Sequence, residues 1–398
     1  MTRTLPPARV VWLVLLGVLL FVFPYLHSVL GFMSGWPVIG WVLVPFRVFQ
    51  AMRFGVWLIV LMGLNLLTGY NGQISLGYAA FVAVGAYVAA VLMTQYGVHV
   101  IPAVLAAGVF TGIVGFLVGA PALRLSGPYL AIATLALVIA FPQVVKHDLV
   151  ADWTHASQGI NFYESGTPPL PPGVLEGRVD NNQWLYYCAM VPAVIMTVLA
   201  WNLTRSRIGR AFLAVRDTEL GAEQMGVNVS LYKMTAFGVS SFYAGIGGAL
   251  FVFTEAVLGP STFDVNISIT MLVMVVLGGL ASILGSIFAA LIMALRVEFV
   301  NAIVGVVPRG QEIRIDALRG AIYGGLLVIA VITGPWGLAG AIRRLPLAKE
   351  RLMAGKFRLP VSGIVPAKVR PFLLRGSRGA KPADPSRQDG TEAQDEPH

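Results

Sequence analysis

An all-α polytopic integral membrane protein is the fold class that the sequence predicts, from three observations. The 398 residues are 57% hydrophobic and only 12% charged, against roughly 25% charged residues in an average soluble protein. The apolar residues fall in repeated long blocks, as transmembrane helices require. The short segments of alternating polarity that mark a transmembrane β-barrel do not occur in the sequence.

Ten stretches of about 20 mostly apolar residues mark the expected spans. In order, they are 10–30, 48–68, 76–96, 99–120, 128–147, 183–203, 231–257, 267–285, 286–306 and 319–340. The first stretch lacks a small-residue cleavage site and is followed by further spans, so we expect a retained helix and not a removed signal peptide. Only the glycine-rich GGLASILGS predicts the turn between the eighth and ninth spans.

The orientation follows from lysines and arginines, which concentrate on the cytoplasmic side of membrane proteins. They are Arg3 and Arg9 before the first span, Arg205, Arg207, Arg210 and Arg216 after the sixth, and Arg343, Arg344, Lys349 and Arg351 after the tenth. Segment 148–182 carries five acidic residues and one arginine, which suits a loop on the outer side. With ten spans, both termini are expected in the cytoplasm.

The formal net charge of +9 has the same origin, and no nucleic-acid-binding module or aromatic-interleaved basic stretch accompanies it. We expect residues 1–345 to form a transmembrane domain. Residues 346–398 form a basic cytoplasmic tail whose composition predicts disorder. The single cysteine, Cys188, excludes an internal disulfide and a cysteine-based metal site. His147 and His155 lack an acidic partner pattern, so no metal site is expected.

The sequence contains no phosphate-binding loop of the G-x-x-x-x-G-K-[ST] type, so we expect no nucleotide hydrolysis by the chain itself. Ion-coupled secondary transporters usually carry ionisable residues in mid-span. Here those positions hold little beyond Arg296 and Glu298, which are two residues apart and do not face each other on a helix. An ion-coupled transporter acting alone remains the alternative. A membrane-embedded enzyme would need clustered His, Asp, Glu or Cys at span ends, and no catalytic residues are expected.

The loop after the sixth span predicts a short amphipathic helix over 209–225, outside the bilayer. Gly226 and Asn228 follow it, and both residue types accept the left-handed geometry that ends a helix. A helix on a glycine-ended turn, joined to a membrane span, is suited to receive force from a soluble partner. An ordinary helix lying on lipid headgroups is the alternative.

The run GYNGQISLG (69–77) places amides, a hydroxyl and glycines between two apolar blocks. One interpretation is a short cytoplasmic turn, because Thr68 to Gly72 has ordinary turn chemistry. The other is a broken or re-entrant segment, which survives at membrane depth only where protein or a water-filled cavity satisfies its backbone. The run has no lysine or arginine, unlike the other inner loops, which favours the broken segment.

Several stretches together resemble the LivM-type permease subunits of branched-chain amino acid ABC importers. They are LNLLTGYNGQISLGYAAFVAVGAY (64–87), PALRLSGPYLAIATLAL (121–137), SRIGRAFLAVRDTELGAEQMGVNV (206–229), TAFGVSSFYAGIGGALF (235–251), MLVMVVLGGLASILGSIFAA (271–290) and GPWGLAG (334–340). The resemblance covers about residues 55–345, and the order of the stretches makes it specific.

The resemblance implies a permease subunit in the bacterial inner membrane that imports branched-chain or related amino acids from periplasm to cytoplasm. Its implied partners are a second, related permease, two cytoplasmic ATPase subunits that hold ATP and Mg, and a periplasmic substrate-binding protein. The chain itself would carry no cofactor. We expect the ATPases to move helix 209–225 and thereby to tilt the sixth and seventh spans.

The resemblance also suggests residues for three roles. For the substrate pathway they are Asn65, Gly72, Gln73, Ser75 and Gly77; for ATPase coupling Arg210, Arg216, Asp217, Glu219, Ala222 and Gly226; for docking of the binding protein Gly159 and Ile160. The coupling motif of ABC importers has the general form Glu-Ala-Ala-x-x-x-Gly. Here Leu220 and Gly221 replace its Glu and first Ala, while Ala222 and Gly226 match.

Overall fold

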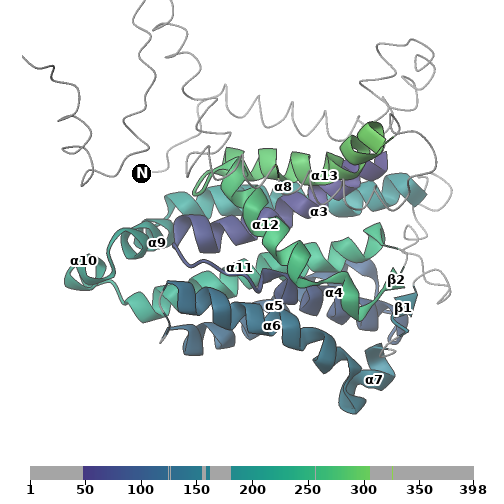
Figure 1. Cartoon of the computed structure of the whole chain (residues 1–398), viewed down its shortest axis with the longest axis horizontal. Helices are drawn as coiled ribbons and strands as arrows, with labels where there is room; N and C mark the ends of the chain where they lie inside the picture. Colours follow the sequence, from purple (N-terminus) through teal and green to yellow (C-terminus); the bar gives the residue numbers. More distant parts are fainter. Residues whose placement is uncertain are drawn as a thin grey trace, which may run out of the picture. The chain divides into compact units, whose positions relative to one another are not determined.

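The computed structural model of the chain describes residues 48–154 except 124 and 126, residues 158–161, residues 181–304 except 256, and residue 325. The expected span 10–30 and the tail 346–398 lie outside the described residues, as does span 319–340 apart from residue 325. The division into a membrane domain and a tail therefore stays a prediction. The described part is helical, with one small two-stranded sheet (Figure 1).

In chain order, the elements are α3 (Val48–Leu64), the π-helix η2 (Asn65–Tyr70), α4 (Tyr78–Thr94), α5 (Val100–Ala122), α6 (Pro128–Lys146), α7 (Asp148–Thr154), β1 (Ile160–Asn161), α8 (Asn181–Arg205), α9 (Arg207–Asp217), α10 (Glu219–Gln224), α11 (Val229–Phe251), η3 (Val252–Thr254), β2 (Val257–Leu258), η4 (Pro260–Thr262), α12 (Val265–Gly278) and α13 (Ile283–Val304).

Six helical stretches in the described part are long and apolar enough to cross a membrane. They are Val48–Tyr70, Val100–Ala122, Tyr129–Lys146, Gln183–Arg205, Val229–Thr254 and Pro260–Gly278, and Tyr78–Thr94 and Ile283–Leu295 are shorter apolar helices. Each of the eight spans expected within the described residues therefore has a helix. The prediction of an all-α polytopic membrane protein is confirmed.

The turn between the eighth and ninth spans falls within GGLASILGS (278–286), as predicted, although it begins before the predicted helix boundary at 285–286. The predicted helices 267–285 and 286–306 correspond to Val265–Gly278 and Ile283–Val304. The chain leaves the helix at Gly279, which has a φ of 118°, a value that glycine adopts readily because it has no Cβ. Ala281 also has a positive φ, of 54°.

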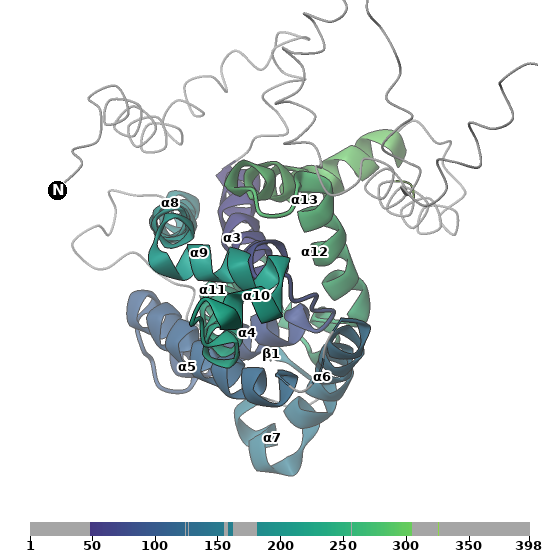
Figure 2. The same cartoon turned by 90° about the vertical axis from the view of Figure 1, so that its left-hand side faces the viewer.

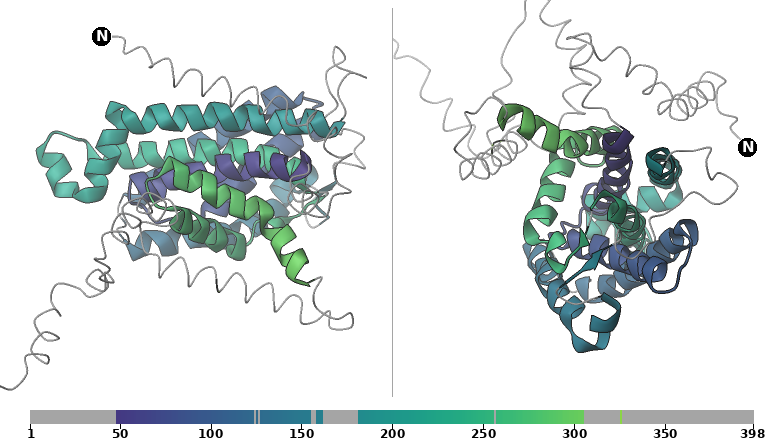
Figure 3. Two further views of the ribbon diagram at one scale, coloured as in Figure 1. Left: turned by 90° about the horizontal axis from the view of Figure 1, so that it is seen from above. Right: turned by 90° about the vertical axis from the view of Figure 1, so that its right-hand side faces the viewer.

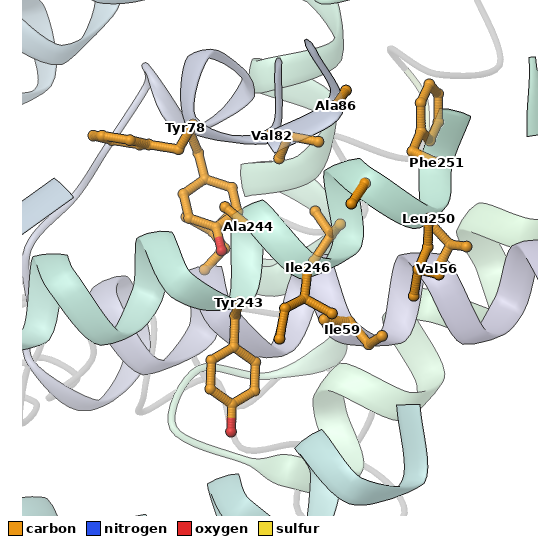
Figure 4. Close-up of a cluster of buried hydrophobic side chains, with 14 of the residues drawn as sticks. Val56, Ile59, Tyr78, Val82, Ala86, Tyr243, Ala244, Ile246, Leu250 and Phe251 are labelled. Atoms are coloured by element: carbon orange, nitrogen blue, oxygen red, sulfur yellow. The ribbon is translucent and has the colours of Figure 1, made fainter. Parts of the chain in front are cut away.

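Helix α11 lies at the centre of the bundle and packs against α5, α4 and α3, as the end-on view shows (Figure 2). Small residues permit the close approach of helices in membranes. A Cβ on Gly245 of α11 would lie 2.7 Å from the Ala107 carbonyl oxygen of α5, and one on Gly108 would lie 2.7 Å from Ile246. Larger side chains of α3, α4 and α11 fill the remaining space (Figure 4).

The outer helices present apolar side chains to their surroundings. Helices α3 and α11 are buried along most of their length, whereas only about a third or less of the α6 and α8 spans is buried. The exposed residues include Ile132 of α6 and Val191 and Ile195 of α8. Exposed apolar side chains on the outer helices suit contact with the lipid bilayer.

The bundle has two distinct ends. Helices α9 and α10 lie at one end, and strands β1 and β2 lie at the other (Figure 1). The view from above shows the α9–α10 pair extending past the long helices (Figure 3). We call these the α10 end and the strand end.

Candidate functional site

The run 69–77 forms a broken, buried segment at the α10 side of the bundle. Helix α3 continues as η2, which ends at Tyr70 with Asn71 as its C-cap. The chain then turns at Gly72, which has a φ of 78°, and α4 begins at Tyr78. Within this segment Asn71, Gln73 and Ser75 are 2%, 6% and 0% exposed, and only Ile74 is exposed among the large apolar residues. A turn in the cytoplasm would expose these amides, so the structure supports the broken segment.

Hydroxyl groups on neighbouring helices satisfy the backbone of this broken segment. The Leu76 amide donates to Thr134 Oγ1 of α6 at 3.0 Å, and Ser268 Oγ of α12 donates to the Leu76 carbonyl. Thr68 Oγ1 donates to the Gln73 carbonyl at 3.1 Å. Irregular backbone at membrane depth needs such partners within the protein, and here three elements supply them.

Asn65 holds the turn between α12 and α13 from the first turn of η2. Its Nδ2 donates to the Ser282 carbonyl at 2.9 Å and to Ser286 Oγ at 2.8 Å, and its Oδ1 accepts from the Ala281 amide at 3.0 Å. The side chain is thus engaged at both of its ends. The predicted place of Asn65 in a substrate pathway stays a prediction.

The other predicted pathway residues lie along the broken segment. Gly72 has a φ of 78°, and the backbone at Gly77 lies directly against the Thr134 carbonyl, which leaves no room for a Cβ. Gln73 Oε1 and Ser75 Oγ are buried without a hydrogen-bond partner among the described residues. Asn71 Nδ2 and Oδ1 are also buried without a hydrogen-bond partner among the described residues. The sequence prediction omitted Asn71, although an amide in an apolar run was the available signal.

The predicted amphipathic helix 209–225 is instead two helices, α9 and α10, separated at Thr218. Thr218 is extended, with φ −154° and ψ 118°, and its amide donates to the Ala214 carbonyl while its own carbonyl accepts from the Ala222 amide. A β-branched residue adopts extended backbone readily, so one helix ends and the next begins around it. Ser206 starts α9 by accepting hydrogen bonds from the amides of Ile208 and Gly209.

Helices α9, α10 and α11 pack together at the α10 end. Val215, Ala222 and Val229, one from each helix, form a buried cluster. Lys233 Nζ of α11 lies 2.7 Å from Glu219 Oε2 of α10. Gly226 has a φ of 78°, which confirms the predicted left-handed end of this unit, and Asn228 instead caps the start of α11 by accepting from the Leu231 amide.

Comparison with known proteins assigns the chain to a family. Residues 47–331 match the family described as branched-chain amino acid transport system / permease component. The chain belongs to this permease family. The match spans the broken segment, the α9–α10 pair and the strand end, and it confirms the resemblance expected from the sequence.

Individual relatives support the assignment. The permease is 29% identical over 317 residues to the high-affinity branched-chain amino acid transport system permease protein LivM of Escherichia coli K12, which covers 75% of this chain and 69% of that protein. LivM of Salmonella typhimurium gives the same figures. The autoinducer 2 import system permease protein LsrC of Escherichia coli O9:H4 is 26% identical over 174 residues, 44% of this chain and 48% of that protein. No solved structure gives a significant match.

The predicted coupling residues of the permease divide into two groups. Asp217 and Gly226 are exposed at the α10 end. The other four make contacts within the chain: Arg210 Nη1 donates to the Arg205 carbonyl at 3.1 Å, Arg216 Nη1 donates to the Gly69 carbonyl at 2.6 Å, Glu219 pairs with Lys233, and Ala222 is 3% exposed. These positions do not test a role in coupling, which stays a prediction.

Two exposed apolar residues of the permease were not expected at this end. Leu220 is 75% exposed and Met225 is 85% exposed, although the amphipathic pattern placed both on the apolar side of one helix. The break at Thr218 changes the direction of the chain, so the pattern read across it as a single helix does not hold. In the sequence, the only sign of their exposure is that two large apolar residues stand within a charged segment.

A cavity of about 100 Å³ lies where the broken segment meets the α9–α10 pair. The broken segment contributes Asn71 and Gln73, α9 contributes Arg216, and Glu219 and Lys233 complete its charged lining. The cavity therefore joins the two regions that the sequence singled out. Within the described residues, no group of three or more His, Cys, Asp or Glu side chains is placed to hold a metal ion.

At the strand end, Ile160 pairs with Leu258 and Asn161 with Val257 in an antiparallel ladder. Gly159 has a φ of 75° and lies against the Leu258 carbonyl, where a Cβ would lie 2.7 Å from the oxygen. The structure thus joins segment 148–182 to segment 258–266. Docking of a binding protein at Gly159 and Ile160 stays a prediction.

Proposed function

We propose that this permease is the membrane subunit of an ATP-driven importer in the bacterial inner membrane, carrying branched-chain or related amino acids into the cytoplasm. The family and the two LivM relatives support the substrate class. The weaker match to LsrC, a permease named for another solute, agrees with a transport scaffold used for more than one substrate.

The observation that carries the proposal is the high exposure of two apolar residues, Leu220 of α10 and Met225, which ends α10. Large exposed apolar side chains outside the spans are available to contact a partner protein. The ion pair of Lys233 with Glu219 and the cluster around Ala222 hold α10 in place. Arginines concentrate near this end, which makes it the cytoplasmic one by the positive-inside rule. A cytoplasmic ATPase subunit is the partner that suits it.

The remaining partners follow from the same arrangement. The sequence holds no phosphate-binding loop, so the energy must come from other subunits, which supply ATP and Mg. The strand end then faces the periplasm, where β1, β2 and Gly159 offer a surface to a substrate-binding protein. A second, related permease completes the importer, and both termini lie in the cytoplasm.

The broken segment is the proposed inner part of the substrate pathway. Asn71, Gln73 and Ser75 carry buried polar atoms that lack partners among the described residues, and buried polar atoms of this kind are usually satisfied by water or a ligand. Gly72 and Gly77 let the backbone bend close to its neighbours, and Asn65 anchors the segment to the α12–α13 turn.

Affinity purification of the permease in mild detergent tests the assignment. We expect a nucleotide-binding subunit to co-purify with it, and substitution of Leu220 and Met225 by serine to release that subunit. Val257→Ser is the matched control, because Val257 is an exposed apolar residue at the opposite end of the bundle. A permease that purifies alone, with no nucleotide-binding partner, would contradict the proposal.

A further inference from the structure

The Gly69 carbonyl lies in the last turn of η2, just before the helix ends. The π-helix η2 ends at Tyr70, and the amides of Asn71 and Gln73 donate to the carbonyls of Leu66 and Leu67. The last carbonyls of a helix need partners from outside it. For Gly69 that partner is Arg216 of α9, whose Nη1 donates at 2.6 Å across 147 residues of sequence. A donor with a full charge makes this a strong hydrogen bond.

A second contact joins the same two elements at Gly72. A Cβ on Gly72 would lie 2.9 Å from Cγ of Arg216 and 3.3 Å from its Cβ. The backbone of the broken segment therefore rests against the aliphatic stem of Arg216. One side chain thus contacts the segment on both sides of Asn71, by a hydrogen bond at Gly69 and by packing at Gly72.

Arg216 also belongs to the unit that carries the exposed apolar pair. Val215, the residue before it, packs with Ala222 and Val229, and the pair of Glu219 with Lys233 fixes α10 to α11. Leu220 and Met225 are therefore linked to Arg216 through packed and ion-paired residues of α9, α10 and α11. Coupling through a structure needs such a chain of packed and hydrogen-bonded groups.

The broken segment has both the space and the chemistry to take a second arrangement. The cavity beside it is about 100 Å³ in volume and is lined by Asn71, Gln73 and Ile74. The side-chain amide of Asn71 and Gln73 Oε1 are buried there without partners among the described residues. These atoms make no hydrogen bond to the described residues that would have to break if the segment shifted.

We propose that Arg216 is a positioning residue that transmits the movement of α9 and α10 to the broken segment at 71–77. The inference rests on the proposed function, in which a cytoplasmic ATPase moves these helices. It adds a direct connection to the segment, beside the tilting of the sixth and seventh spans. In this arrangement the substrate pathway responds to the ATPase through one side chain of the same subunit.

The test follows the accessibility of the segment in the complete, reconstituted importer. Ile74→Cys in a Cys188→Ser background places one thiol on the exposed face of the segment. Its labelling rate with a charged, water-soluble thiol reagent is measured without nucleotide and with a non-hydrolysable ATP analogue. We expect the rate to differ between the two states, and Arg216→Gln to abolish the difference while the ATPase still co-purifies.

Arg207→Gln is the matched control, because Arg207 is exposed on the same helix and the charge change is identical. It should keep the nucleotide-dependent difference. If Arg216→Gln yields no complex, Arg216→Met is read by the same criterion, since methionine keeps an aliphatic stem against Gly72 but has no donor for the Gly69 carbonyl. A nucleotide-dependent difference that survives at Arg216→Gln, or at Arg216→Met where that variant is read, overturns the inference.

The two proposals fail in different ways. An unsubstituted complex without ATP-dependent uptake would contradict the proposed function. A complex that transports, but in which the thiol at position 74 never responds to nucleotide, would contradict the role of Arg216 alone.

Discussion

Lys233 of α11 and Glu219 of α10 form an ion pair with a nitrogen–oxygen distance of 2.7 Å, in which the lysine side chain is 9% exposed and the glutamate side chain 52% exposed. The pair joins the first turns of a central membrane helix to a short helix outside the spans. Because one partner is buried and the other is not, the two single substitutions should differ in their effects.

Glu219→Ala should destabilise the permease more than Lys233→Met does. The first leaves a buried ammonium without its carboxylate, whereas the second removes the charge and keeps the aliphatic volume. The exposure of Glu219 limits the difference to about 1 kcal/mol. Thermal unfolding of the purified variants in detergent measures it. Equal losses, or a larger loss for Lys233→Met, would show that the pair does not fix α10.

Asn65→Ala should be strongly destabilising. It leaves the Ala281 amide and the Ser282 carbonyl without their Asn65 hydrogen bonds, at roughly 1–3 kcal/mol for each orphaned group. Asn266→Ala is the control, because Asn266 is exposed and bonds only to the nearby Asp264 through its side chain. Thermal unfolding should separate the two variants clearly. Similar melting temperatures would mean that the α12–α13 turn does not depend on Asn65.

The sequence predicted the broken segment because polar residues in a long apolar run conflict with an uninterrupted membrane helix. It predicted the left-handed turn at Gly226 for a local reason, since glycine favours that backbone. The positions of single spans also followed from local hydropathy. Such features depend on neighbouring residues and are visible without a structure.

Other features depend on contacts between distant residues. Asn65 bonds to Ser286, 221 residues away, and Arg216 bonds to Gly69, and neither pairing has a local signature. The break at Thr218 was missed because the apolar pattern of α9 and α10 fits one helix almost as well. The predicted boundary at 285–286 was wrong because several glycines there could each form the turn. In the folded protein α12 ends at Gly278 and Gly279 takes the positive φ.

Gly226→Val should uncouple ATP hydrolysis from transport while leaving membrane insertion intact. Gly226 has a φ of 78°, and no atom of the described residues lies within 4 Å of an added Cβ, so the substitution strains the backbone without a clash. Gly226→Asn is the matched control, because asparagine tolerates this conformation far better than a β-branched residue. ATPase and uptake rates of reconstituted complexes are compared. Normal coupling in Gly226→Val would argue against a coupling role for this turn.

Gly245→Leu should prevent the close packing of α11 against α5. Its added side chain would meet the Ala107 carbonyl and the Thr111 side chain, and helix backbones this close accept only small residues. Leu105→Val serves as the control, since Leu105 is more than half exposed on the outer face of α5. The yield of monodisperse protein by size-exclusion chromatography reports the outcome. A normal yield for Gly245→Leu would show that the two helices can separate without loss of the fold.

The central claim is that this chain transports only as part of an ATP-driven complex, and uptake by proteoliposomes tests it most directly. The purified permease, with its related permease, ATPase subunits and binding protein, is reconstituted and supplied with radiolabelled leucine. We predict accumulation of leucine that requires ATP and every partner, and none by the permease alone under an imposed ion gradient. Gradient-driven uptake by the permease alone would contradict the account.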